Sequence, residues 1–180
     1  MIIVEGPDGA GKTTLIELLK VELGLEVAPR VVSKDAEAMT DLMVWTDKNL
    51  DAGFQPLIFD RHRLISEPIY GPALRKHQSE GFNNFAWLAP RINQLYRSVR
   101  PIMIYCLPPV EVVMANIATD PDNLVVLEKI EAIHAAYTAK ASMDWAIYDG
   151  TIHIWDYTKS QGKPPIWLRD IRMELAERAY

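Results

Sequence analysis

The chain alternates short apolar runs with longer stretches in which apolar residues recur every three or four positions. Short runs of this kind predict buried strands, and the longer spacing predicts helices with one apolar face. Strands are expected at Ile2–Glu5, Leu25–Ala28, Pro56–Phe59, Ile102–Leu107 and Ile152–Trp155. Helices are expected over 12–23, 39–50, 83–99, 126–137 and 168–175, with Pro90 kinking or dividing the third of them. This alternation predicts an α/β fold in which helices cover both faces of a five-stranded parallel sheet.

The segment after the first predicted strand reads Gly6-Pro7-Asp8-Gly9-Ala10-Gly11-Lys12-Thr13 and fits the phosphate-binding pattern G-x-x-x-x-G-K-S/T without a mismatch. A strand before the pattern and a helix after it are the context that this motif requires. Its glycines allow backbone N–H groups to surround phosphate oxygens, and the helix N-terminus adds partial positive charge. We expect a nucleoside triphosphate here, with Lys12 on its phosphates and Thr13 on Mg²⁺. The residues assigned to this site are Gly6, Asp8, Gly9, Ala10, Gly11, Lys12, Thr13 and Thr14.

A second polar block, Asp60-Arg61-His62, follows the third predicted strand. Parallel strands carry ligand sites at their carboxyl ends, so this block is expected to meet the phosphate loop in one cleft. An Asp there can hold Mg²⁺ through water, and the neighbouring Arg can bind a second phosphate group with two hydrogen bonds. Lys12, Asp60 and Arg61 are therefore the predicted catalytic residues, and Thr13 and Asp60 the predicted metal-binding residues.

The two motifs together resemble the thymidylate kinase and deoxynucleoside monophosphate kinase family, particularly its small phage-encoded members. Asp60-Arg61-His62, Ser66 and Tyr70 match the second motif of that family, and the resemblance covers nearly the whole chain. It implies a P-loop three-layer sandwich of the nucleoside monophosphate kinase type, with ATP as donor and Mg²⁺ as cofactor. It also implies that Arg30 and Arg61 bind the acceptor phosphate, and that Trp45 or Tyr70 stacks on the acceptor base.

The chain departs from this family in two places. The spacing from Asp60 to Ser66 is one residue longer than in the bacterial pattern. The short lid segment expected at about 116–127 contains no Lys or Arg, although related kinases place an arginine near the transferred phosphoryl group. Arg63 and Arg75 are the candidates for supplying that charge.

Three functions are compatible with the residues. The leading one is ATP-dependent phosphoryl transfer to a deoxynucleoside monophosphate, as in dTMP kinase. The alternative is a phage-type DNA kinase that phosphorylates 5-hydroxymethyluracil in DNA, with Asp35 or Asp60 as the base that a hydroxyl acceptor needs. The third is a nucleotide-binding switch or partner module without catalysis, which the lid without cations keeps open.

The composition fits a globular domain. With 180 residues we expect one domain over 1–180, and a net charge of −5 offers no basic track for a DNA strand. The single Cys106 and the absence of any apolar run of about 18 residues predict a cytoplasmic protein without a membrane partner. For a phage-encoded chain this is the host cytoplasm. The expected partner is a small nucleotide, with nucleic acid only in the DNA-kinase alternative, and a homodimer is left open.

Overall fold

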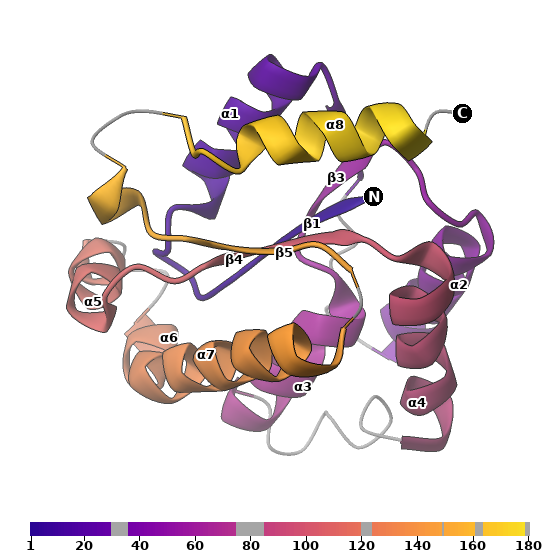
Figure 1. Cartoon of the computed structure of the whole chain (residues 1–180). Coiled ribbons are helices and arrows are strands. Elements are labelled where there is room, and N and C mark those ends of the chain that lie inside the picture. Colours follow the sequence, from indigo (N-terminus) through magenta and orange to yellow (C-terminus); the bar gives the residue numbers. More distant parts are fainter. Residues whose placement is uncertain (30–35, 75–84, 120–123, 149, 161–163, 179–180) are drawn as a thin grey trace.

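The computed structural model describes residues 1–29, 36–74, 85–119, 124–148, 150–160 and 164–178, with the backbone alone at 36–43, 85–87 and 124. A five-stranded sheet crosses the centre of the molecule (Figure 1). Its strands are β1 (Ile2–Glu5), β2 (Glu26–Val27), β3 (Leu57–Asp60), β4 (Ile102–Cys106) and β5 (Ile152–Trp155). All four pairings are parallel, and the order is β2-β3-β1-β4-β5. The five predicted strands and the parallel arrangement are confirmed.

Helices lie on both faces of the sheet. The helices along the chain are α1 (Lys12–Leu23), α2 (Ala36–Asp51), α3 (Arg63–Leu74), α4 (Phe85–Gln94), the π-helical segment η1 (Leu95–Val99), α5 (Val110–Ala118), α6 (Leu124–Leu127), α7 (Ile130–Ile147), the 3₁₀ turn η3 (Tyr157–Lys159) and α8 (Leu168–Arg178). Figure 1 shows α1 and α8 on one face of the sheet and α3 and α7 on the other. None of the helices in the described parts of the chain is long and apolar enough to cross a membrane.

Alternate residues of the strands face opposite layers, as the two-residue period of a strand requires. One cluster packs against α1, α8 and α5 and includes Ile2, Val4, Ile58, Ile102 and Ile104. The other packs against α3, α4 and α7 and includes Met1, Ile3, Phe59, Met103 and Tyr105. Because the central strands are buried on both faces, each contains a continuous apolar run, which β1 and β3 end with the carboxylate residues Glu5 and Asp60. These apolar runs are the pattern that predicted the strands from the sequence.

Two helices, α3 and α5, were not predicted. Pro68, Gly71 and Pro72 indicate turns, yet all three lie within α3. The helix buries Leu64, Ile65 and Tyr70, so tertiary packing outweighs the poor helix propensity of these residues. The predicted helix 83–99 does not break at Pro90, which lies inside α4, and the irregularity comes later, in η1.

Candidate functional site

The phosphate loop joins the carboxyl end of β1 to the N-terminus of α1. Gly6 has φ 143°, and a Cβ atom there would lie 2.5 Å from the carbonyl oxygen of Cys106. Gly11 has φ 80° and is the N-cap of α1, which has no side-chain cap. Positive φ values and the close approach of β4 therefore require glycine at these positions. The uncapped N–H groups of α1 face the loop, which is the arrangement that binds anions.

Lys12 is the first residue of α1, and its side chain returns over the loop. Its Nζ donates a hydrogen bond of 2.7 Å to the carbonyl oxygen of Pro7, and the residue is only 9% exposed. Burial, with a smaller contribution from the nearby Arg61 charge, lowers the pKa of Lys12 to about 8. An anionic oxygen beside this ammonium would favour its charged form. The lysine is thus held where a phosphate group in the loop would meet it.

Arg61 follows β3 and ties the second motif to the loop. Its backbone has φ 66°, an uncommon conformation for a residue other than glycine. Its Nη2 donates to Asp8 Oδ1 at 2.6 Å, to the Tyr70 hydroxyl at 2.8 Å and to the Gly6 carbonyl at 3.2 Å. The guanidinium carbon lies 4.6 Å from the centre of the Tyr70 ring. The Arg61 Nε–H is buried without a hydrogen-bond partner, while three hydrogen bonds from Nη2 fix the guanidinium beside the loop.

Asp8 and Tyr70 complete this cluster. The Tyr70 hydroxyl donates to Asp8 Oδ2 at 3.0 Å and accepts a bond of 2.9 Å from the Asp8 backbone N–H. Burial of Asp8 favours its neutral form, but the Arg61 and Lys12 charges outweigh burial and hold the pKa of Asp8 below its ordinary value. Asp8 is therefore an anion that fixes both the arginine and the tyrosine beside the loop.

The loop and the second motif line one cavity of about 860 Å³. Lys12, Thr13 and Thr14 contribute one side of it, and Asp60 and Arg61 contribute another. A threonine hydroxyl and a carboxylate are oxygen donors of the kind that Mg²⁺ prefers when it is also bound to substrate phosphates. The donor set in this cavity therefore fits a magnesium-bound polyphosphate.

Glu5 is a site residue that the sequence analysis missed. It ends β1, is completely buried, and accepts hydrogen bonds from the His62 backbone N–H at 2.6 Å and the Tyr137 hydroxyl at 3.0 Å. Burial raises the pKa of Glu5 to about 7, although the His62 bond and the Arg61 charge oppose this shift. The carboxyl group thus links β1, the turn that carries Arg61, and α7. An acidic residue at the end of an apolar strand was the available signal.

Replacing Glu5 by glutamine is expected to remove a pH dependence of stability. The pKa of Glu5 is raised from 4.5 to about 7, so the folded protein binds the proton more tightly than the unfolded chain, and stability falls as pH rises through this window. At about 1.4 kcal/mol per pKa unit, ionisation of the buried Glu5 carboxyl group lowers the free energy of unfolding by up to about 3 kcal/mol. Urea unfolding at pH 5 and pH 8 should show E5Q gaining stability relative to the wild type at the higher pH.

The comparison with E5Q separates the effect of Glu5 on stability from that of His62. Burial lowers the pKa of His62 to about 4, so its contribution to stability changes with pH in the opposite direction. An equal difference in unfolding free energy between the two proteins at both pH values would contradict this role of Glu5.

The other predicted acceptor residues are distributed as follows. Trp45 is half-buried, with its ring centre 5.9 Å from that of Phe59 and 5.8 Å from that of His62. Ser66 is buried in α3, and its hydroxyl donates to the His62 carbonyl at 3.3 Å. Neither Trp45 nor Ser66 lines the cavity that holds the phosphate loop. Arg30, Asp35 and Arg75 lie outside the described residues.

The expected lid begins in α5 and continues into α6, with residues 120–123 outside the described part of the chain. Its first residue, Asn116, lines the cavity together with Trp155 and Tyr157 from the end of β5 and η3. Arg63, proposed as a source of positive charge, donates to Glu67 of its own helix at 3.0 Å. Asn116, Trp155 and Tyr157 were not identified from the sequence, because they lie far from the motifs along the chain.

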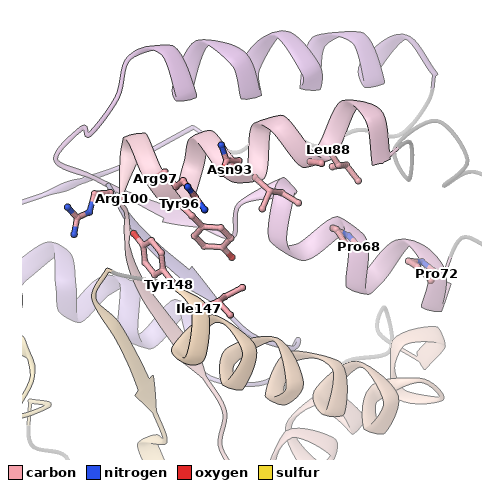
Figure 2. A pocket seen from close by; sticks show the side chains of 11 residues that line it. Pro68, Pro72, Leu88, Asn93, Tyr96, Arg97, Arg100, Ile147 and Tyr148 are labelled. Atoms are coloured by element: carbon pink, nitrogen blue, oxygen red, sulfur yellow. The ribbon is translucent and has the colours of Figure 1, made fainter.

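A second cavity, of about 980 Å³, lies between α3, the α4–η1 segment and the end of α7 (Figure 2). Figure 2 shows the rings of Tyr96 and Tyr148 close together, and their centres are 4.9 Å apart. The Tyr148 hydroxyl donates to the Pro101 carbonyl at 2.7 Å. Arg100 lies at one end of the cavity and Pro72 at the other. No residue of the phosphate loop lines it.

No known family profile matches the chain, and no curated protein matches it. Among solved structures, the YorR protein of Bacillus subtilis, in complex with phosphorylated GDP, is similar over 99% of this chain and 98% of its own, with a TM-score of 0.67 and 18% identity. Deoxyadenosine kinase from M. mycoides with dCMP and dCDP is similar over 98% of both chains, with a TM-score of 0.59 and 19% identity. The same kinase with dATP has a TM-score of 0.60 at 16% identity and covers 99% of this chain and 97% of that one.

These identities are low, and the likeness therefore shows the fold. The expected P-loop sandwich of the nucleoside monophosphate kinase type is confirmed, since the parallel sheet in the order β2-β3-β1-β4-β5 with helices on both faces matches these structures.

Proposed function

We propose that this protein transfers a phosphoryl group from ATP to a nucleotide acceptor, and that the acceptor is a deoxynucleoside monophosphate. One observation carries the proposal: Lys12, Thr13, Asp60 and Arg61 line a single cavity at the N-terminus of α1. Phosphoryl transfer between two anionic groups requires positioning and neutralisation of charge more than covalent chemistry. These residues provide both. The likeness to YorR with phosphorylated GDP and to deoxyadenosine kinase with dCMP and dCDP supports a nucleotide ligand.

The donor is held by the loop. Backbone N–H groups around Gly9 to Thr13 surround the β- and γ-phosphates, and Lys12 approaches them with an ammonium that is already buried at the loop. Thr13 and Asp60 are the residues that would hold Mg²⁺ in this cavity. Mg²⁺ supplies neutralisation of phosphate charge.

The acceptor phosphate is held by Arg61. The guanidinium is fixed by Asp8 and Tyr70, and Arg61 lines the cavity that also contains Lys12 and Thr13. Because the described part of the lid has no cation, we assign to Arg61 the neutralisation of the transferred group that a lid arginine performs in related kinases. Arg30 on the acceptor phosphate, Trp45 on the base and Ser66 in the acceptor site remain predictions.

A hydroxyl acceptor is the second candidate, and the likeness to deoxyadenosine kinase favours it. Such an acceptor, whether a free deoxynucleoside or 5-hydroxymethyluracil in DNA, needs a carboxylate base within hydrogen-bond reach. Asp60 lines the cavity and is the predicted base that lies within the described residues, whereas Asp35 lies outside them. The net charge of −5 disfavours the polymer.

The test is ADP release from ATP and Mg²⁺ in the presence of single acceptors. The panel contains each deoxynucleoside monophosphate, each deoxynucleoside, and hydroxymethyluracil-containing DNA. Turnover of a monophosphate supports the leading proposal, whereas turnover of deoxynucleosides or DNA alone replaces it by the hydroxyl-acceptor function. ATP binding without acceptor-dependent ADP release would support the non-catalytic switch.

A further inference from the structure

The outer wall of the phosphate-loop cavity is formed by an aromatic side chain. A Cβ atom at Gly11 would lie 2.9 Å from Cδ1 and 3.1 Å from Cε1 of Tyr157. The Tyr157 ring is therefore in direct contact with the backbone of the last glycine of the loop. Its ring centre lies 5.8 Å from that of Trp155, and both side chains line the cavity that also holds Lys12 and Thr13.

The Tyr157 hydroxyl is held by a residue from another part of the chain. Asn116 Nδ2 donates to the Tyr157 hydroxyl at 2.8 Å and to the Gly9 carbonyl at 2.8 Å. Two hydrogen bonds from one side-chain amide thus connect the phosphate loop, α5 and η3. Figure 1 shows α5 and the turn after β5 at the same end of the sheet. We call this pair the Asn116–Tyr157 clasp.

The clasp has no charge, so it cannot neutralise phosphate groups. Lys12 and the N-terminus of α1 fix the phosphate end of the cavity. From there the cavity continues past Gly11 to Trp155, Tyr157 and Pro164. A triphosphate in the loop would therefore direct its nucleoside toward this wall, and an aromatic ring is a favourable surface for a nucleobase.

Resting on the proposed function, we propose that Tyr157 determines donor specificity by providing the surface on which the donor nucleoside lies, and that Asn116 positions the Tyr157 ring and the Gly9 carbonyl. The ligand class is a nucleoside triphosphate, in preference to a bare tripolyphosphate. Asn116 acts through Tyr157 and the loop, so it is a positioning residue.

Calorimetry with MgATP and with magnesium tripolyphosphate tests this proposal. Tyr157→Ala should weaken ATP binding about tenfold or more, because base–aromatic stacking is lost, and should change tripolyphosphate binding about threefold at most. Equal losses for the two ligands, or no loss for either, would overturn the proposal. If the wild-type protein binds neither ligand, it is the proposed function that fails. Tyr157→Leu is the second variant if Tyr157→Ala does not fold.

Steady-state kinetics of the Tyr157→Phe and Asn116→Ala variants test the hydrogen bond from Asn116 Nδ2 to the Tyr157 hydroxyl. Each variant should raise the KM for ATP about threefold, with little change in the acceptor KM. Since both substitutions break the same bond, the double variant should be no worse than the Asn116→Ala variant. Multiplied effects in the double variant would show that the two residues act separately and would overturn the role of Asn116. Lys159→Ala, an exposed neighbour in η3, is the matched control.

Discussion

Replacing Lys12 by alanine is expected to lower kcat/KM for ATP about 1,000-fold while leaving the protein folded. The ammonium is buried against the loop carbonyl of Pro7 and is one of the charges that a transferred phosphoryl group would meet in this cavity. Removal of one preorganised hydrogen-bond donor from such a site lowers the catalytic rate about 10²- to 10³-fold. Because Lys12 also carries a formal charge, we expect a loss at the upper end of this range. Folding should persist because burial of the charge is itself unfavourable, as the pKa lowered to about 8 indicates.

Lys20→Ala is the matched control, because Lys20 lies on the same helix, is partly exposed and pairs with Glu17. Acceptor-dependent ADP release measures activity, and a thermal melt measures folding. A Lys12→Ala protein that melts like the wild type and retains normal activity would contradict the donor site, and with it the proposed function.

Replacing Arg61 by alanine is expected to lower kcat/KM for the acceptor about 1,000-fold, since an arginine that neutralises a transferred phosphoryl group contributes that much or more. ATP affinity should change far less. The substitution should also destabilise the fold by about 3 kcal/mol, because it leaves the partly buried Asp8 carboxylate without its cation. Steady-state kinetics against both substrates, together with urea unfolding, separates the two effects.

Two further variants distinguish catalysis from structural support. Arg61→Lys keeps a charge but loses the planar donor set, so it should recover more stability than activity. Tyr70→Phe removes one acceptor of the Arg61 Nη2 and should have a smaller effect on acceptor kinetics. Equal losses of ATP and acceptor affinity in Arg61→Ala would contradict the assignment of Arg61 to the acceptor.

The central strands were predictable because both faces of the sheet are covered by helices. Ile2, Ile3 and Val4 are wholly buried, so strand β1 is a continuous apolar run up to Glu5, its last residue. Helix α3 was not predictable from local patterns, since Pro68, Gly71 and Pro72 all indicate turns. Its helical state depends on contacts of Leu64, Ile65 and Tyr70 with residues distant in the sequence.

In the candidate site, too, some features were predictable from the local sequence and others depend on contacts between distant residues. The phosphate loop and Asp60-Arg61 were identified because their spacing along the chain is itself the chemical requirement. The sequence also placed Tyr70 near the site, but not its hydrogen bonds to Asp8 and Arg61. Trp45 was expected at the acceptor base, and it packs against Phe59 and His62 outside the described cavity.

The sequence by itself determined the phosphate loop, the strand before it and the helix after it, because these features depend on glycine conformations and apolar runs within a few residues. Only the tertiary structure decided that Glu5 accepts from His62 and Tyr137, and that Asn116 joins Gly9 to Tyr157. Those partners are more than 40 residues apart in every case. Packing of helices on the sheet brings them together, and no local pattern encodes which side chains then meet.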